Sequence, residues 1–127
     1  MMAKMIFQSF GREFEVSEED RLDAATAVSG SGPAYVYYLA EALMEAATDL
    51  HFTSEEALKM VHQTFLGAME LWAETRESPA VLRQKVTSKK GTTDAAISQF
   101  EKNKLKAKFI EGVRAAYRRS LELGKDK

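Results

Sequence analysis

The chain has 127 residues, of which 45% are hydrophobic and 29% are charged, and its formal net charge of −1 argues against a dedicated nucleic-acid binder. It has no cysteine, which excludes disulfides and thiolate metal sites, and its two histidines, eleven positions apart, cannot hold zinc unaided, so we expect no metal centre. No apolar run approaches the roughly 20 residues that span a membrane and no signal-peptide core opens the chain, so we expect a cytoplasmic protein.

The first residues carry two short patterns that differ from the rest of the chain. Residues 1–10 have the spacing of one or two helical turns, and Gly11 is placed to end them. Residues 12–16 alternate apolar and charged side chains, which indicates a short strand. A helix, a glycine and a strand make an odd beginning for a helical domain. We therefore interpret residues 1–16 as the end of, or the connection to, a preceding domain.

Helical spacing, capping residues and glycine or proline breaks predict an all-α domain of five or six helices with short loops over residues 17–127. Thr53 and Glu56 have the spacing of a capping box, and Ser78 precedes a proline that suits the first position of a helix. Gly124 is expected to end the last helix. The expected helices cover residues 17–28, 33–51, 53–76, 78–86, 93–102 and 105–123.

The third expected helix is apolar on nearly every side over residues 65–73. Only Glu70 is charged there, and a helix that is apolar all round must be buried all round. A domain of this size rarely surrounds a helix completely, so the pattern predicts a second chain as partner. Gly67 and Ala68 would allow two helices to approach closely.

A polar loop, Val86-Thr87-Ser88-Lys89-Lys90-Gly91-Thr92-Thr93, separates two amphipathic patterns. Thr92 or Thr93 is expected to be the N-cap of the helix that follows, with Asp94 in its first turn. The unpaired N–H groups of a helix start, two lysines and several hydroxyls favour a site for an anion such as a carboxylate or a phosphate. The alternative is a capped helix start with two solvated lysines.

A second loop, Ser29-Gly30-Ser31-Gly32-Pro33, is expected to break the chain between the first two helices. It is a poor phosphate cradle, because the dinucleotide fingerprint needs a third glycine where Tyr35 stands and a strand where we expect a helix. A tight turn that lets another group approach the backbone suits its small residues better. Tyr35, Tyr37 and Tyr38 are expected to pack against their surroundings.

Four segments together carry a resemblance to a known family: Ser29-Gly30-Ser31-Gly32-Pro33-Ala34-Tyr35, Gln63-Thr64-Phe65-Leu66-Gly67-Ala68, Val86-Thr87-Ser88-Lys89-Lys90-Gly91-Thr92-Thr93 and Arg119-Ser120-Leu121-Glu122-Leu123-Gly124. They closely resemble pyrroline-5-carboxylate reductase, and the resemblance covers the chain from about Phe10 onward. It implies an oxidoreductase of proline biosynthesis that reduces 1-pyrroline-5-carboxylate to L-proline with NADPH or NADH.

The resemblance also implies a domain organisation. In the family, an N-terminal Rossmann domain binds the cofactor, and a C-terminal helical bundle forms an intertwined homodimer or a higher homo-oligomer. This bundle has a fold similar to the C-terminal domain of 6-phosphogluconate dehydrogenase. The chain looks like this second domain, with residues 17–127 for dimerisation and substrate binding, and we expect it to be inactive alone because it contains no nucleotide fingerprint.

By resemblance, one set of residues holds the substrate carboxylate, mainly through hydroxyl and backbone N–H groups: Ser88, Gly91, Thr92 and Thr93. Thr93 would also hydrogen-bond the ring nitrogen, which makes it the expected catalytic residue. The loop Ser29-Gly30-Ser31-Gly32 would line the site near the nicotinamide. The family often has proline-glycine where Lys89-Lys90 stand, a departure that should change loop stiffness and add positive charge.

Two other interpretations are weighed against this one. The chain would instead be a stand-alone helical dimeric binding module if it had lost the nucleotide domain. A helical adaptor or nucleic-acid module that uses a lysine strip is disfavoured by the net charge; the strip comprises Lys102, Lys104, Lys106 and Lys108.

Overall fold

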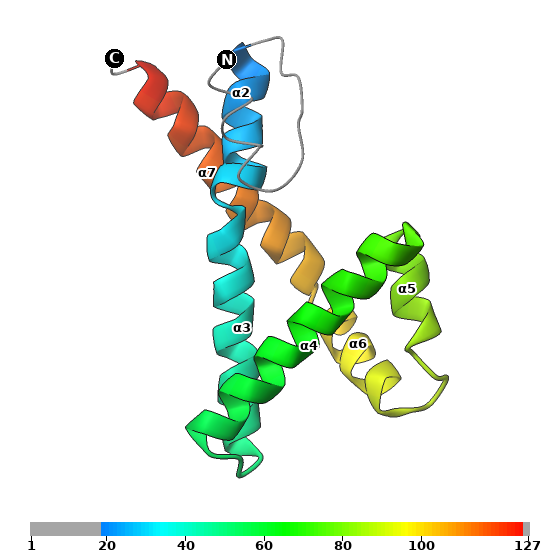
Figure 1. Cartoon of the computed structure of the whole chain (residues 1–127). Coiled ribbons are helices and arrows are strands. Elements are labelled where there is room, and N and C mark those ends of the chain that lie inside the picture. The colour runs from blue at the N-terminus through cyan, green and yellow to red at the C-terminus, as the bar shows by residue number, and fades with distance from the viewer. Residues whose placement is uncertain (1–18, 126–127) are drawn as a thin grey trace. The chain divides into compact units, whose positions relative to one another are not determined.

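The computed structural model describes residues 19–125, so the helix and strand expected in residues 1–16 lie outside the described residues. Over the described residues the chain is helical and has no strand, which confirms the predicted all-α class (Figure 1). No helix in this described part is both long and apolar enough to cross a membrane. The elements are α2 (Glu19–Ala25), the π-helical turn η1 (Thr26–Gly30), α3 (Gly32–Asp49), α4 (Ser54–Thr75), α5 (Pro79–Lys85), α6 (Thr92–Lys102) and α7 (Leu105–Lys125).

The chain forms two compact units. Among the described residues, unit 1 comprises residues 19–37 and 106–125, and unit 2 comprises Tyr38–Leu105. Unit 1 therefore contains α2, η1, the first turns of α3 and nearly all of α7. Unit 2 contains the rest of α3 together with α4, α5 and α6.

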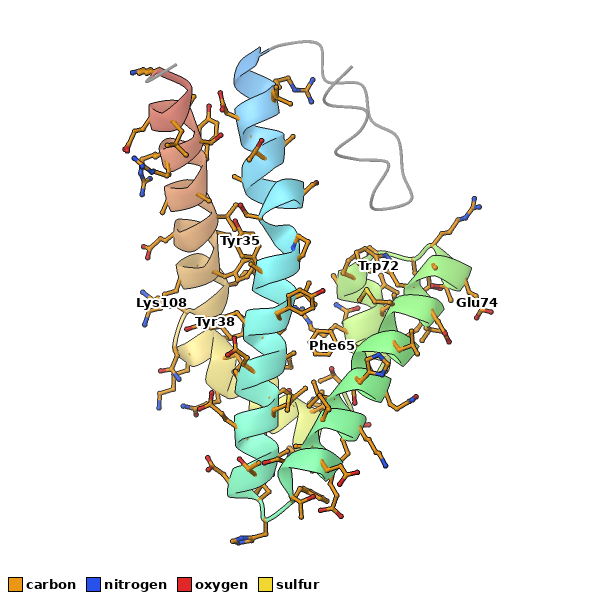
Figure 2. All side chains as sticks on the ribbon, turned by 60° about the vertical axis from the view of Figure 1, so that its left-hand side comes forward. Tyr35, Tyr38, Phe65, Trp72, Glu74 and Lys108 are labelled. Atoms are coloured by element: carbon orange, nitrogen blue, oxygen red, sulfur yellow. The ribbon has the colours of Figure 1, made fainter. Side chains whose placement is uncertain are left out.

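In unit 1, α2 and α7 lie side by side although they come from opposite ends of the described chain (Figures 1 and 2). The Ser120 hydroxyl on α7 donates a 2.7 Å hydrogen bond to the Asp23 carboxylate on α2. Because hydrogen bonds to charged groups are among the stronger ones, this pair helps to fix the two helices together.

Tyr35 links the start of α3 to both η1 and α7. Its ring meets the ring of Phe109 edge to face, with centroids 5.6 Å apart, and its hydroxyl donates a 2.6 Å hydrogen bond to the Ala27 carbonyl. Tyr35 thus packs as expected. Tyr37 and Tyr38 are exposed in the single chain, with exposed fractions of 69% and 77%.

The break predicted between the first two helices is smaller than expected, because a π-helical turn carries the chain almost to α3. The Ser31 N–H donates to the Thr26 carbonyl at 2.9 Å, which is the five-residue spacing of a π-helix. The Thr26 hydroxyl donates to the Leu22 carbonyl at 3.0 Å and ties the turn to α2. Helix α3 begins at Gly32, and Pro33 still lies in its first turn, where no N–H donor is needed.

In unit 2, a tight turn joins α3 to α4. Helix α3 ends before the expected residue His51, which has a left-handed backbone (φ 75°), and the Phe52 N–H donates back to the Ala47 carbonyl at 3.1 Å. The predicted capping box then opens α4. The Thr53 hydroxyl accepts from the Glu56 N–H at 3.1 Å, and the Glu56 carboxylate accepts from the Thr53 N–H at 2.9 Å.

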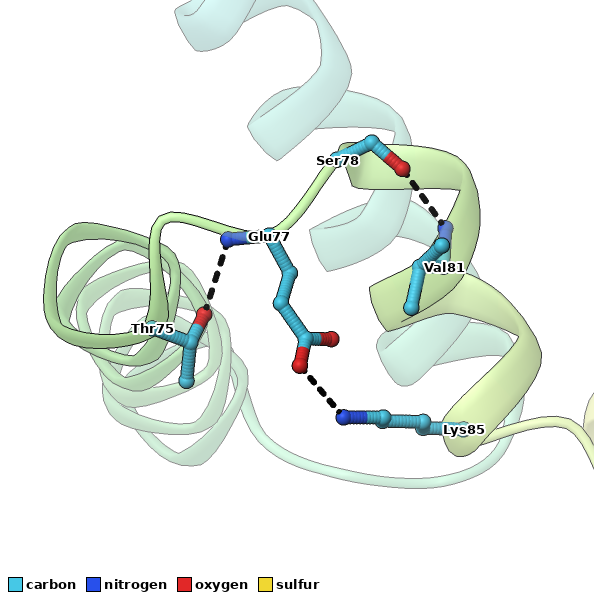
Figure 3. A network of polar contacts seen from close by, with 5 residues as sticks. All are labelled: Thr75, Glu77, Ser78, Val81 and Lys85. Carbon is cyan, nitrogen blue, oxygen red and sulfur yellow. Dashed lines mark hydrogen bonds and ion pairs between the residues drawn. The ribbon is translucent and has the colours of Figure 1, made fainter.

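A polar network holds the corner between α4 and α5 (Figure 3). The Ser78 hydroxyl accepts from the Val81 N–H at 3.2 Å, which confirms Ser78 as the N-cap of α5. The Glu77 N–H donates to the Thr75 hydroxyl at 3.3 Å, and the Lys85 ammonium lies 2.7 Å from the Glu77 carboxylate. The ion pair connects the residue before Ser78 to the last residue of α5, so it helps to orient this short helix.

The end of α7 differs from the prediction. The helix runs through Gly124 to Lys125, whereas α6 ends at Lys102 as expected. A glycine ends a helix when it adopts the left-handed conformation, and Gly124 does not adopt it. The glycine therefore continues the helix at a modest cost in conformational entropy.

Few side chains of the described residues are buried. The buried apolar residues are Ala27, Ala57 and Val61 alone, and none of them is large. Exposed apolar side chains on α4 include Leu58, Met60, Leu66, Met69, Leu71 and Trp72. Apolar surface of this extent is typical of interaction sites, so it supports the partner chain predicted from residues 65–73.

Candidate functional site

The polar loop between α5 and α6 ends in a helix start without a side-chain cap. The N-cap is Gly91 and neither Thr92 nor Thr93, so the predicted N-cap is wrong. Thr92, Thr93 and Asp94 occupy the first three positions of α6 instead. The N–H groups at these positions have no acceptor within the helix and point out of its N-terminal end.

A β-turn sets the shape of the loop. The Gly91 N–H donates to the Ser88 carbonyl at 2.9 Å, which closes a four-residue turn. Lys90, at the third position of this turn, has a left-handed backbone (φ 63°) that residues with a side chain rarely adopt. The Asp94 carboxylate accepts a 3.0 Å hydrogen bond from the Lys90 N–H. This bond ties the turn to the first turn of α6.

Position 91 has too little room for a side chain, which explains the glycine there. A Cβ atom at this position would lie 3.1 Å from the Ser88 carbonyl oxygen and 3.3 Å from the Ser88 Cβ, both closer than ordinary contacts. The φ of Gly91 is −88°, which other residues adopt freely, so crowding restricts this position and backbone strain does not.

The start of the loop is also held by polar contacts. The Thr87 hydroxyl donates a hydrogen bond to the Arg83 carbonyl on α5. Two residues earlier, Lys85 makes the ion pair with Glu77 described above. Hydrogen bonds and an ion pair therefore hold the loop at its start, beside α5, and the Asp94 contact holds it at its end, beside α6.

The arrangement can accept an anion. Ser88 and Thr92 are exposed, and Thr93 is half-buried with a hydroxyl that makes no hydrogen bond to the described residues. The N–H groups and the positive end of the α6 dipole favour a carboxylate or phosphate. The Asp94 carboxylate also lies in the first turn of α6, so a bound anion would have a negative charge of the protein near it.

The second predicted loop lies in unit 1, whereas the polar loop lies in unit 2. Ser29, Ser31 and Gly32 are half-buried and Gly30 is exposed. A Cβ atom on Gly32 would meet no atom within 4 Å, so another group can approach the backbone there. The π-helical turn η1, which includes Ser29 and Gly30, is no substitute for the strand of a nucleotide cradle. These residues do not have the arrangement that binds the phosphates of a dinucleotide.

Two contacts that hold the polar loop were missed by the sequence reasoning. The bond from Lys90 to Asp94 had a usable signal, because an acidic residue three positions after an N-cap often accepts from a nearby N–H. The ion pair of Glu77 and Lys85 had none, because their spacing of eight residues matches no local motif.

A model of a protein family, described as pyrroline-5-carboxylate reductase dimerisation, matches residues 19–123. The chain belongs to this family. The match confirms the resemblance inferred from the sequence.

Named relatives agree with the family match. The pyrroline-5-carboxylate reductase of Synechocystis is 49% identical over 97% of this chain and 46% of its own length. That of Pseudomonas aeruginosa is 40% identical over 95% of this chain and 44% of its own. The chain therefore spans less than half the length of these relatives.

Solved structures agree as well. The reductase of Coxiella burnetii has a TM-score of 0.86 and 43% identity, over 96% of this chain and 45% of its own. The Plasmodium falciparum protein, solved with NADP bound, has a TM-score of 0.85 and 32% identity, over 97% of this chain and 47% of its own. These matches support the family and the fold, whereas the roles of Ser88, Gly91, Thr92 and Thr93 stay predictions.

Proposed function

We propose that this chain is the helical dimerisation and substrate-binding domain of a pyrroline-5-carboxylate reductase, which makes L-proline from 1-pyrroline-5-carboxylate. The observation that carries the proposal is the family match over residues 19–123. The 43% identity to a solved reductase, across 96% of the chain, adds to it. Residues 17–127 form the domain in this proposal, and residues 1–16 connect it to a nucleotide-binding domain.

In this proposal the substrate carboxylate binds at the first turn of α6. The N–H groups of Thr92 and Thr93 and the exposed Ser88 hydroxyl are its donors. Gly91 contributes differently, because its N–H already donates to the Ser88 carbonyl. Its missing side chain lets the turn close against the helix start and leaves room for the carboxylate.

Thr93 holds the ring nitrogen of the substrate. Its hydroxyl has no partner among the described residues, so it is free to accept the N–H of a protonated imine. Protonation makes the imine carbon electrophilic, and a hydrogen bond to the N–H favours this form. Fixing the carboxylate and the nitrogen together also orients the carbon, which contributes to catalysis by lowering the entropic part of the barrier.

NADPH or NADH supplies the hydride when bound. The residues of this chain that would lie near the nicotinamide are Ser29, Gly30, Ser31 and Gly32. The open side of Gly32 supports this role, because no neighbouring atom blocks an approach to its backbone. The phosphates of the nucleotide would bind to the other domain.

The same proposal makes the protein a homodimer or a higher homo-oligomer. The family is described by its dimerisation, and the apolar side chains of α4 are exposed in the single chain. A second copy of the chain that covers them would complete the core that Ala57 and Val61 of α4 only begin.

The test uses the native polypeptide in which this chain occurs. NADPH oxidation is followed with 1-pyrroline-5-carboxylate for the wild type, for Thr93→Ala and for Ser98→Ala, an exposed hydroxyl on the same helix. We expect Thr93→Ala to lower kcat/KM by about tenfold or more and Ser98→Ala to change it less than about twofold.

The outcomes separate the interpretations. Equal kinetics for Thr93→Ala and the wild type would remove Thr93 from the site. If an immunoblot of source cells shows a polypeptide of about 14 kDa that binds L-proline without reduction, the stand-alone binding module is the correct function. A polypeptide of about twice this mass with reductase activity supports the proposal.

A further inference from the structure

Asp94 makes a contact that the proposed chemistry leaves unexplained. Its carboxylate accepts from the Lys90 N–H at 3.0 Å, at a residue whose backbone is left-handed. An L-residue with a side chain is disfavoured in that conformation, so surrounding contacts must hold it there. Within the described residues, Asp94 supplies the side-chain acceptor for this peptide group.

The conformation of Lys90 determines where the rest of the turn lies. If Lys90 moved to an ordinary conformation, the turn closed by the hydrogen bond from Gly91 to the Ser88 carbonyl would have to change its type, and the peptide group between Lys89 and Lys90 would rotate. Gly91 and Ser88 lie close enough that a Cβ atom on Gly91 would be 3.1 Å from the Ser88 carbonyl oxygen, so a change in the turn would also alter their spacing. Asp94 therefore acts on the Ser88 hydroxyl and on the helix start through the backbone of Lys90.

We propose that Asp94 is a positioning residue of the substrate-carboxylate site, which holds Lys90 in the left-handed conformation and so keeps Ser88 and the first turn of α6 in their binding arrangement. This inference rests on the proposed function for the identity of the ligand. It adds a residue that touches neither the substrate nor the cofactor.

The contact carries a second consequence, because the acceptor is charged. The Asp94 carboxylate lies in the first turn of α6, where the substrate carboxylate is proposed to bind, and like charges repel. Asparagine at this position would keep an acceptor oxygen and remove the charge. Alanine would remove both, so the two substitutions separate the hydrogen bond from the charge.

The first measurement is the hydrogen-exchange protection of the Lys90 amide in the native polypeptide. We expect Asp94→Ala to lower the protection factor about tenfold and Asp94→Asn to keep it within about threefold. Circular dichroism of each variant checks that the helix content is unchanged. Equal protection in Asp94→Ala and the wild type would overturn the inference without reference to any ligand.

The second measurement is the affinity for L-proline, by titration of the same variants. We expect Asp94→Ala to weaken binding about fivefold to tenfold and Asp94→Asn to bind as tightly as the wild type or more tightly. Lys90→Gly should rescue Asp94→Ala, because glycine adopts the left-handed conformation without the carboxylate. A residue that merely caps α6 would not be rescued by a change at Lys90, so an unrescued double variant contradicts the inference.

Failure of the proposed function gives a different result. If the wild type shows neither L-proline binding nor reduction of 1-pyrroline-5-carboxylate, the assigned ligand is wrong, while the exchange of the Lys90 amide still tests the contact. If the wild type binds L-proline and Asp94→Ala binds it equally well, the ligand is supported and the positioning role is refuted.

Discussion

Trp72 provides the sharpest test of the predicted partner chain. It is the only tryptophan of the chain, it lies near the end of α4, and 42% of its surface is exposed in the single chain. Figure 2 shows Trp72 and Glu74 on opposite sides of this helix, as expected for residues two positions apart. We expect Trp72→Ala to weaken the dimer and Glu74→Ala to leave it nearly unchanged.

The exposed area of Trp72 sets the size of the effect. A tryptophan side chain has about 250 Å² of surface, so 42% is about 100 Å², worth about 2.5 kcal/mol at 25 cal/mol per Å². Alanine retains part of this area, which leaves a loss of about 2 kcal/mol for each chain. A twofold interface contains the residue twice, so the loss is about 4 kcal/mol for each dimer and raises Kd roughly a thousandfold.

Sedimentation equilibrium over a dilution series measures Kd for the wild type and both variants. The fluorescence of Trp72 provides an independent signal, because its emission should shift to longer wavelength as the wild-type dimer dissociates. A wild-type chain that is monomeric at micromolar concentration would refute the burial argument. A dimer whose Kd rises less than threefold in Trp72→Ala would place Trp72 outside the interface.

Three further outcomes are expected. Tyr35→Phe should lower the free energy of unfolding by about 1 kcal/mol in urea titrations, because the carbonyl of Ala27 loses its donor, and an unchanged midpoint would contradict this. Gly91→Ala should destabilise the chain by about 1–3 kcal/mol through the contact with Ser88, so a thermal melt with no decrease in Tm would refute the crowding. The 127-residue chain alone should show no NADPH-dependent reduction of 1-pyrroline-5-carboxylate, and activity above background would reveal a nucleotide site that the sequence analysis missed.

Helix starts were predictable where the signal is local. The capping box of Thr53 and Glu56 and the N-cap at Ser78 each involve a side chain and an N–H only three residues apart. Such contacts form in any helix that begins there, whatever the rest of the chain does. The sequence therefore contains all the information that these two starts require.

The π-helical turn was unpredictable for the opposite reason. Glycines and a proline in the sequence indicate a break, but the Tyr35 hydroxyl donates to the carbonyl of Ala27 from eight residues away. The position of Tyr35 depends in turn on Phe109, which lies on α7 at the far end of the chain. Contacts of this separation are absent from any local pattern, so the turn becomes visible only in the folded chain.

The candidate site was partly predictable. The polar loop, the helix that follows it and the first-turn position of Asp94 are all as the sequence indicates, whereas the N-cap is Gly91. The error arose because hydroxyl side chains are the usual caps, whereas this helix begins at Gly91 with no side-chain cap and Asp94 accepts from the N–H of Lys90 before it. Thr93 is consequently a first-turn residue whose hydroxyl is left without a partner among the described residues.

The two lysines of the polar loop now have a physical interpretation. Proline-glycine, which the resembling family often has at these positions, suits the second and third positions of a turn whose third residue has positive φ. Lys90 takes that conformation without the freedom of glycine, at φ 63°. The hydrogen bond to Asp94 stabilises at Lys90 the left-handed conformation that a glycine would adopt without a partner. The loop can therefore keep its shape after losing both residues, provided that an acceptor remains at position 94.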